Sequence, residues 1–183
     1  MRAVDIGIGA AWAAFWLYWL AAAATSKRTA SRSAQGVAVR LVIAIVAALI
    51  IRVSGWFDHA TFNGNPAMAA AGVVLFVLGL ALAVWARVHL GRNWGTPMSE
   101  KAEPELVTSG PYRRIRHPIY SGIILASIGT ALAVTWYWLI VAALIAVYFV
   151  YSATVEERIM TRLFPNAYPP YRRSTKMLVP FLL

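Results

Sequence analysis

The residues best suited to chemistry gather in one short stretch, residues 110–122, which reads GPYRRIRHPIYSG. Three arginines, one histidine and two tyrosines stand there, immediately before a long apolar run. Arginines beside a helix start favour a carboxylate or phosphate ligand, because the helix start also presents free N–H groups. Farther along lies the chain's only consecutive acidic pair, Glu156-Glu157. The chain contains no cysteine, which excludes disulfides, thiolate metal sites and cysteine nucleophiles, and no metal site is predicted.

The composition of the 183-residue chain is that of an integral membrane protein. Hydrophobic residues make up 60% of it and charged residues 13%, with a positive mean hydropathy. The formal net charge of +10 lies in the gaps between apolar runs rather than on a soluble face. Positive charge in such gaps marks the cytoplasmic side of a bilayer, so membrane lipids are expected neighbours and nucleic acid is not.

Five apolar segments are near the roughly 20 residues that a helix needs to cross the hydrocarbon core. They are residues 4–24, 37–55, 67–88, 118–134 and 138–155. Helices satisfy every backbone amide within one segment, so the sequence predicts an all-α membrane protein with about five transmembrane helices. We expect a single domain over 1–183, with two helices in 1–66 and a core in 67–183. The first segment ends in AAAATS, which resembles a signal-peptide cleavage site, but the stronger positive charge behind it favours a retained helix.

Basic residues set the predicted orientation. If the N-terminus, loop 52–66 and turn 135–137 share one side, that side holds two basic residues, Arg2 and Arg52. The other side holds the remaining fifteen. The positive-inside rule then places the N-terminus outside and the C-terminus in the cytoplasm.

The fourth and fifth segments are so close in sequence that they must form a helical hairpin, with Trp136 at its tip. His117 lies nineteen residues before Trp136, and Glu156 lies twenty after it. At about 1.5 Å per residue, both arms return a similar distance along the membrane normal. The hairpin therefore brings His117 to Glu156-Glu157 at the cytoplasmic end. Pro118 suits the first turn of a helix, and Tyr120 follows His117 on a similar face.

Each polar residue of this cluster also has a simpler explanation. The arginines at 113, 114 and 116 would equally meet anionic lipid head groups, and Tyr112 would suit an interfacial aromatic belt. Glu156 and Glu157 would be solvated if nothing held them, although carboxylates oppose the dipole at a helix C-terminus. Beyond 157, the pattern predicts a short basic amphipathic helix that lies along the membrane surface or closes a cavity over the site. Its apolar face is formed by Ile159, Met160, Leu163 and Phe164.

These motifs together resemble the isoprenylcysteine carboxyl methyltransferase family and its relatives, the phospholipid N-methyltransferases. The shared signature is R-H-P-x-Y, then a helical hairpin, E-E, and an F-x-x-x-Y-x-x-Y tail. In this chain it is formed by Arg116-His117-Pro118-Ile119-Tyr120, Glu156-Glu157, Phe164, Tyr168 and Tyr171. HLGRNWG at 89–95 is similar to the family's segment after its preceding helix. The resemblance covers roughly residues 75–180, and it departs from the family at Pro165, where a glycine is usual.

The resemblance implies a membrane-embedded methyltransferase that uses S-adenosylmethionine without a Rossmann fold. The cofactor would then be bound by His117, Tyr120, Glu156 and Glu157, helped by Gly110, Tyr112 and Arg113 in the 110–113 turn. The acceptor would be a lipophilic small molecule, a lipid or a prenylated protein, as in isoprenylcysteine carboxyl O-methylation or phospholipid N-methylation.

Proton handling separates the acceptor classes. A carboxylate acceptor needs only an arginine to hold it, and Arg172 or Arg173 is the candidate. An ammonium or thiol acceptor must lose a proton, and Glu157 is the candidate base. The sequence leaves both open. Two other functions also stay open at this point, an NADPH-dependent sterol-type reductase and a non-enzymatic membrane scaffold.

Overall fold

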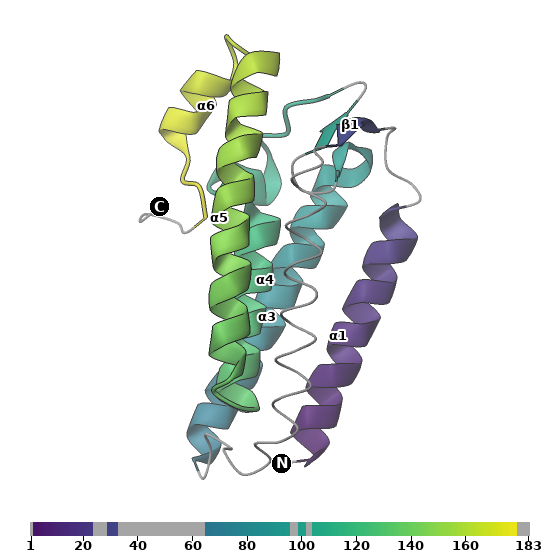
Figure 1. The fold of residues 1–183 in the computed structure, drawn as a ribbon, viewed down its shortest axis with the longest axis vertical. Coiled ribbons are helices and arrows are strands. Elements are labelled where there is room, and N and C mark those ends of the chain that lie inside the picture. The colour runs from purple at the N-terminus through teal and green to yellow at the C-terminus, as the bar shows by residue number, and fades with distance from the viewer. Residues whose placement is uncertain (1, 24–28, 33–64, 96–98, 102–103, 179–183) are drawn as a thin grey trace.

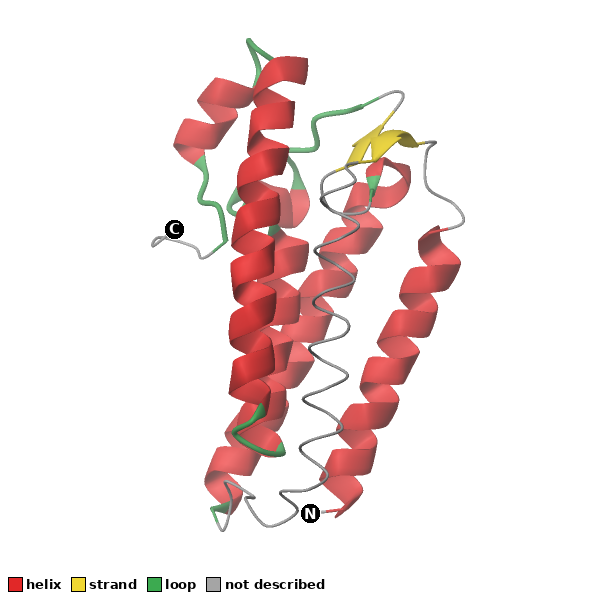
Figure 2. Cartoon of the chain, in the orientation of Figure 1, coloured by secondary structure: helices red, strands yellow, loops and turns green. Residues whose placement is uncertain are grey.

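The computed structural model describes residues 2–23, 29–32, 65–95, 99–101 and 104–178. Long helices run side by side along the longest axis of the molecule, and a short helix covers one end (Figure 1). The helices are α1 (Arg2–Ala23), α3 (Pro66–Leu90), α4 (Pro118–Ala133), α5 (Trp138–Leu163) and α6 (Tyr168–Ser174). Two 3-10 turns are present, η1 (Gly91–Asn93) and η2 (Gly110–Arg113). Strands β1 (Thr29–Arg32) and β2 (Ser99–Lys101) pair antiparallel into a small ribbon (Figure 2).

Three described helices, α1, α3 and α5, are long and apolar enough to cross a membrane, while α4 is a shorter apolar helix. The predicted segments 4–24, 67–88 and 118–134 are therefore confirmed as helices. The predicted second segment, 37–55, lies outside the described residues.

The fifth helix is longer than predicted. The hydrophobic pattern was expected to end at 155 and a separate surface helix to begin beyond 157, but α5 continues unbroken to Leu163. The reason is that residues 156–163 contain good helix formers and no proline, so the first breaker is Pro165. The residues Ile159, Met160 and Leu163 are thus the last turns of α5, and the short helix beyond them is α6.

Helices α3 and α4 pack against each other along most of their lengths, and glycines make this possible. Gly72 and Gly79 of α3 face Gly129 and Gly122 of α4. A Cβ added at any of the four would meet backbone atoms of the other helix at 2.3–2.6 Å. In a membrane such close backbone approach is a main source of helix association, because burying apolar surface gains little against lipid.

Helix α1 is attached to this pair by aromatic residues. The Trp12 indole donates a hydrogen bond to the Thr130 hydroxyl of α4 (3.1 Å), and its ring packs edge-on against Phe76 of α3. The Trp12 N–H thus finds its partner between helices. Trp19 of α1 is buried.

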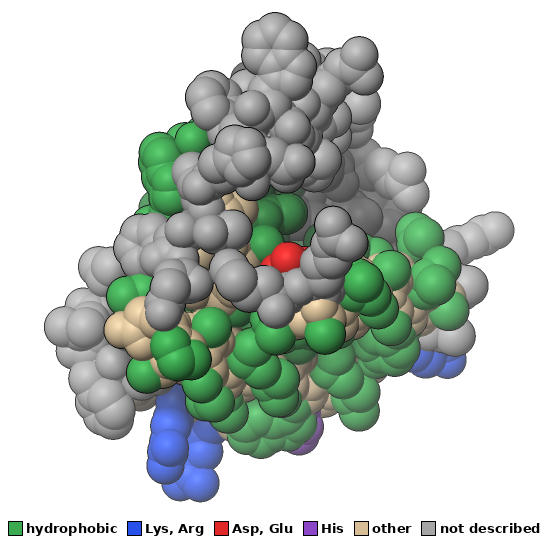
Figure 3. All heavy atoms as spheres, turned by 90° about the horizontal axis from the view of Figure 1, so that it is seen from below, with side chains coloured by type: hydrophobic (Ala, Val, Ile, Leu, Met, Phe, Trp, Pro, Cys, Tyr) green, Lys and Arg blue, Asp and Glu red, His purple; other side chains and the backbone are tan. Residues whose placement is uncertain are grey.

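The polar chemistry lies at one end of the bundle, where α1, α3 and α5 end and α4 begins (Figure 1). Nearly all described basic residues lie at or near this end. They are Arg32, Arg87, Arg92, Lys101, Arg113, Arg114, Arg116, Arg158, Arg162, Arg172, Arg173 and Lys176, which leaves Arg2 at the other end. Figure 3 looks at the opposite end and shows mostly hydrophobic side chains among the residues it colours, with Lys and Arg at the margins.

Candidate functional site

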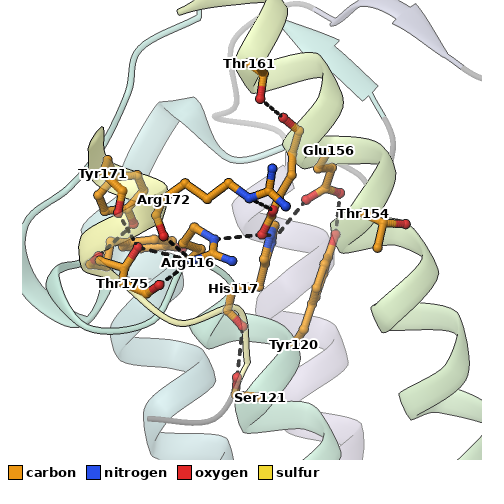
Figure 4. Close-up of polar contacts among 12 residues, drawn as sticks. Arg116, His117, Tyr120, Ser121, Thr154, Glu156, Thr161, Tyr171, Arg172 and Thr175 are labelled. Atoms are coloured by element: carbon orange, nitrogen blue, oxygen red, sulfur yellow. Dashed lines mark hydrogen bonds and ion pairs between the residues drawn. The ribbon is translucent and has the colours of Figure 1, made fainter. Parts of the chain in front are cut away.

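The α4–α5 hairpin brings His117 and Glu156 together, as the equal arm lengths predicted. His117 Nδ1 lies 3.5 Å from Glu156 Oε2, and the Tyr120 hydroxyl donates to Glu156 Oε1 (Figure 4). The His117 and Tyr120 rings stack at a centroid distance of 5.4 Å, and Tyr120 stacks in turn on Phe149 of α5 at 4.2 Å. His117, Tyr120 and Glu156 therefore form one ordered unit held by both arms of the hairpin.

Glu157 occupies a different place from its neighbour, in a buried network of charges. Only 4% of its side chain is exposed, and it accepts from Arg116 Nε at 2.7 Å. Arg172 Nε of α6 pairs with Glu157 Oε2 at 2.9 Å. His117 Nε2 lies 3.6 Å from Glu157 Oε1, the oxygen that Arg116 also contacts. One carboxylate thus connects the start of α4, the end of α5 and the short helix α6.

Residues 175–178 are hydrogen-bonded to the start of α4 and to the residues just before it. The backbone N–H groups of Arg116 and His117 donate to the carbonyls of Lys176 (2.8 Å) and Met177 (3.1 Å), and Lys176 N–H donates back to Arg114. The Arg116 guanidinium also donates to the carbonyls of Arg172 and Thr175. The tail therefore satisfies the two amides that come directly before α4.

A cavity of about 580 Å³ opens beside the cluster. Four of the predicted site residues line it: Tyr112, His117, Tyr120 and Glu156. Arg116 also lines it, whereas the predicted residues Gly110, Arg113, Glu157 and Arg172 do not. Arg113 is exposed, and Arg172 faces Glu157.

Gly110 has a conformational role in the turn that leads to the site. Its φ of 58° lies in the left-handed region, and a Cβ there would lie 2.7 Å from the His89 ring. His89 in turn contacts the Ser109 hydroxyl at 2.9 Å. The glycine therefore lets the turn lie close against the end of α3 and present Tyr112 to the cavity.

Several cavity residues were not predicted from the sequence. Those from α1, η1 and the loop after β2 are Trp16, Trp19, Leu20, Asn93, Trp94, Glu105 and Val107, and those from α5 include Tyr148 and Phe149. HLGRNWG at 89–95 was noted only by resemblance, and segment 4–24 only as an apolar run. No spacing rule pairs α1 with residues so distant in sequence, so hydropathy alone could not find them.

Burial and the two carboxylates control the protonation of the site. Burial lowers the pKa of His117, but its contacts with Glu156 and Glu157 outweigh burial, so the pKa is raised. Burial raises the pKa of Tyr112 and Tyr168, and it raises the pKa of Tyr171 to about 12. These phenols are therefore neutral near pH 7. The Tyr171 hydroxyl donates to the Tyr112 carbonyl at 2.7 Å, which ties α6 to η2.

Raising the pH is expected to weaken the fold through His117. A raised pKa in the folded state means that protonation stabilises the fold fully below about pH 6.5, the ordinary value of histidine. That contribution is lost as the pH rises through the raised pKa. The unfolding temperature in detergent should therefore fall more steeply above pH 6.5 in the wild-type protein than in His117→Gln. The same pH dependence in both proteins would contradict this.

Comparison with known proteins agrees on one family. The family model described as "Phospholipid methyltransferase" matches residues 67–167. Protein-S-isoprenylcysteine O-methyltransferase B of Arabidopsis thaliana is 28% identical, over 61% of this chain and 58% of its own. Cobalt-zinc-cadmium resistance protein CzcN of Cupriavidus metallidurans is 31% identical, over 78% of this chain and 62% of its own. This chain thus spans about three fifths of the length of these two relatives.

The fold is also similar to that of a solved membrane enzyme. The solved structure is that of the eukaryotic intramembrane Ras methyltransferase ICMT, with a TM-score of 0.58 and 22% sequence identity. The similarity covers 78% of this chain and 52% of the solved chain. At that identity the comparison supports the helical arrangement rather than any particular substrate.

Proposed function

We propose that this chain, which belongs to the phospholipid methyltransferase family, is a membrane-embedded methyltransferase that uses S-adenosylmethionine to methylate a lipophilic acceptor. The observation that carries the proposal is the His117–Tyr120–Glu156 unit, which lines a largely aromatic and aliphatic cavity at one end of a bundle of apolar helices. Charge and lipophilicity meet there, as a reaction between a polar cofactor and a greasy acceptor requires.

The cavity residues fit S-adenosylmethionine. The cavity volume of about 580 Å³ is typical of small-molecule sites. The Glu156 carboxylate suits an ammonium group or ribose hydroxyls, and Arg116 suits a carboxylate. The Tyr112 ring, which lines the cavity, can hold an adenine or face a cation. When bound, this cofactor supplies an electrophilic methyl group on a positively charged sulfur.

The chain's own residues then align and shield the reactants. Tyr120 keeps Glu156 in place through its hydroxyl, and Phe149 keeps Tyr120 in place by stacking. Tyr168 and Tyr171 cover the cavity from α6 and help to exclude water. Alignment and dehydration are the main requirements of an in-line methyl transfer.

Glu157 and Arg172 were proposed from the sequence as base and acceptor clamp, and their contacts favour a different assignment. Glu157 does not line the cavity and is paired with both arginines. We assign Glu157 and Arg172 to positioning, because together they hold Arg116 and close α6 over the site. Gly110 and Arg113 likewise support or flank the turn that carries Tyr112. Of the two glutamates, Glu156 is placed to accept a proton.

A prenylated cysteine carboxylate is the acceptor that we favour. Such a carboxylate is ionised near pH 7 and needs no base, and its apolar chain suits the aromatic lining of the cavity. The Arabidopsis thaliana relative carries isoprenylcysteine in its name. A phospholipid amine is the second candidate, supported by the description of the matching family; Glu156 would then accept the proton.

The core of the enzyme is proposed to comprise residues 67–183, and α1 completes its cavity through Trp16, Trp19 and Leu20. The clustering of basic residues at the site end supports a cytoplasmic site and C-terminus, with the N-terminus outside. A water-soluble cofactor would then reach the site directly from the cytoplasm.

Ligand-induced stabilisation tests the cofactor. In detergent, S-adenosylmethionine or its demethylated product, S-adenosylhomocysteine, should raise the unfolding temperature by roughly 5–10 °C at about 100 times the Kd. NADPH at the same concentration should have no effect. Stabilisation by NADPH alone would instead support a sterol-type reductase, and stabilisation by none of the three would support a scaffold. Incubation with the methyl-labelled cofactor and a prenylcysteine or an amine phospholipid then identifies the acceptor.

A further inference from the structure

Arg87 is an arginine buried within a membrane-spanning helix. It lies in α3 and is only 3% exposed. A buried charge in a span is costly and indicates a specific role. Its Nη1 donates to the Gly91 carbonyl at 2.8 Å, and its Nη2 donates to the Ala22 carbonyl of α1 at 2.6 Å. The guanidinium group therefore joins the end of α1 to the end of α3.

The same guanidinium group holds an aromatic column. Its central carbon lies 4.7 Å from the centroid of the Trp94 ring, which is a cation–π contact. Trp94 meets Trp19 of α1 edge-to-face, with the ring centroids 5.9 Å apart. Trp19 and Trp94 line the cavity, whereas Arg87 does not. Arg87 thus acts from behind on two rings that face the interior.

The column belongs to the apolar side of the cavity lining. The lining residues from α1, α3 and the residue after η1 are all apolar: Trp16, Trp19, Leu20, Leu90 and Trp94. The polar lining side chains of the proposed cofactor site, His117, Tyr120 and Glu156, come from α4 and α5. Helices α4 and α5 also contribute apolar residues such as Ile123 and Phe149, but α1 and α3 contribute apolar residues alone.

We propose that Trp19 and Trp94 form the surface on which the apolar chain of the acceptor rests, and that Arg87 is the positioning residue that fixes this surface. The inference rests on the proposed methyltransferase function and assigns the specificity for a lipophilic acceptor to named residues. Arginine suits the task because its planar fork donates to two carbonyls while its face stacks on a ring, which lysine does not reproduce.

The test measures methyl transfer to N-acetyl-S-farnesylcysteine and to N-acetyl-S-butylcysteine, together with the Kd of S-adenosylhomocysteine. Trp94→Leu and Arg87→Met should raise the KM for the farnesyl acceptor about tenfold, the size of one lost aromatic contact. The values of kcat, of the cofactor Kd and of the butyl acceptor KM should stay within about twofold, because these do not depend on the apolar surface. Trp94→Phe, which keeps a ring, should stay near wild type, and Arg87→Lys should fall between wild type and Arg87→Met.

Trp85→Leu is the matched control for the loss of a tryptophan. Trp85 lies on α3, the helix of Arg87, where it is exposed and does not line the cavity. Trp85→Leu should leave every constant unchanged. An unchanged farnesyl KM in folded Trp94→Leu, or an equal loss of cofactor affinity, overturns the inference while the proposed function stands. If Arg87→Met does not fold, the comparison of Trp94→Leu with Trp94→Phe decides. A wild-type protein that binds no S-adenosylhomocysteine refutes the proposed function itself, and one that binds it but methylates neither probe refutes the acceptor and this surface together.

Discussion

Glu156→Gln is expected to lower the affinity for S-adenosylhomocysteine about 10- to 100-fold while the protein keeps its fold. Hydrogen bonds to a charged group contribute roughly 1.5–3 kcal/mol, which corresponds to that range of affinities. Glutamine fills the same space and still accepts a hydrogen bond from Tyr120. His117 keeps Glu157 at 3.6 Å from its Nε2, so losing the charge of Glu156 leaves no buried ion without a partner. Isothermal titration of the detergent-purified protein measures the loss.

The neighbouring position provides the matched control, because Glu157→Gln makes the same chemical change one residue away. Glu157→Gln should lower the free energy of unfolding, and not only the affinity for the cofactor. Arg116 is 8% exposed and would lose its carboxylate partner, and breaking a buried pair costs about 3–5 kcal/mol. Arg172 is 57% exposed and adds little to that cost. Wild-type binding in Glu156→Gln, or an undisturbed unfolding temperature in Glu157→Gln, would contradict the separate roles proposed for the two glutamates. His117→Ala should also abolish binding, because it removes the group stacked on Tyr120.

Gly129→Ala is expected to prevent α3 and α4 from packing, although it adds one methyl group. The new Cβ would lie 2.3 Å from the backbone nitrogen of Phe76 and 2.6 Å from the carbonyl oxygen of Gly72. No side-chain rotation relieves a clash with backbone, so the two helices must separate. Separation would also loosen the contact between Gly79 and Gly122 and shift the start of α4, which carries the site. We expect severe loss of folded protein, measured as monodisperse material after extraction in detergent.

The control for this prediction is a second glycine-to-alanine change, which is expected to stabilise the protein rather than destabilise it. Gly9 lies in α1, and a Cβ at Gly9 meets nothing within 4 Å. Replacing a helical glycine by alanine in open space stabilises a helix by roughly 0.5–1 kcal/mol, so Gly9→Ala should be neutral or mildly stabilising. Equal yields of folded Gly129→Ala and Gly9→Ala would show that the close approach of α3 and α4 is not needed for folding.

The meeting of His117 and Glu156 could be predicted from the sequence because it follows from counting. Two helical arms of nearly equal length on a tight turn have only one way to return. The segments of α1, α3 and α4 were also predictable, because each is a continuous apolar run. The division of labour between Glu156 and Glu157 was not predictable, because it depends on which face of α5 meets Arg116 and α6. No count along the chain gives that rotation.

Two signals were present in the sequence but were not used. The stretches GVVLFVLG at 72–79 and GIILASIG at 122–129 place glycines seven residues apart on both helices, which is the spacing of a close helix crossing. Arg87 within an apolar segment was the second signal, because a charge there calls for a partner. The pairing of residues 175–178 with the start of α4 carries no recognisable pattern, since backbone groups make most of those bonds.

That pairing also has a consequence for how the protein is made. Arg116 leaves the ribosome well before Thr175, whose carbonyl lies 59 residues later in the chain and accepts a hydrogen bond from its guanidinium group. The α4–α5 hairpin is therefore available for membrane insertion while its cofactor end is still unfinished. A nascent chain that stops before Thr175 contains both arms of the hairpin but lacks the bonds that fasten the start of α4, so the proposed site is completed only by residues that are synthesised after the hairpin.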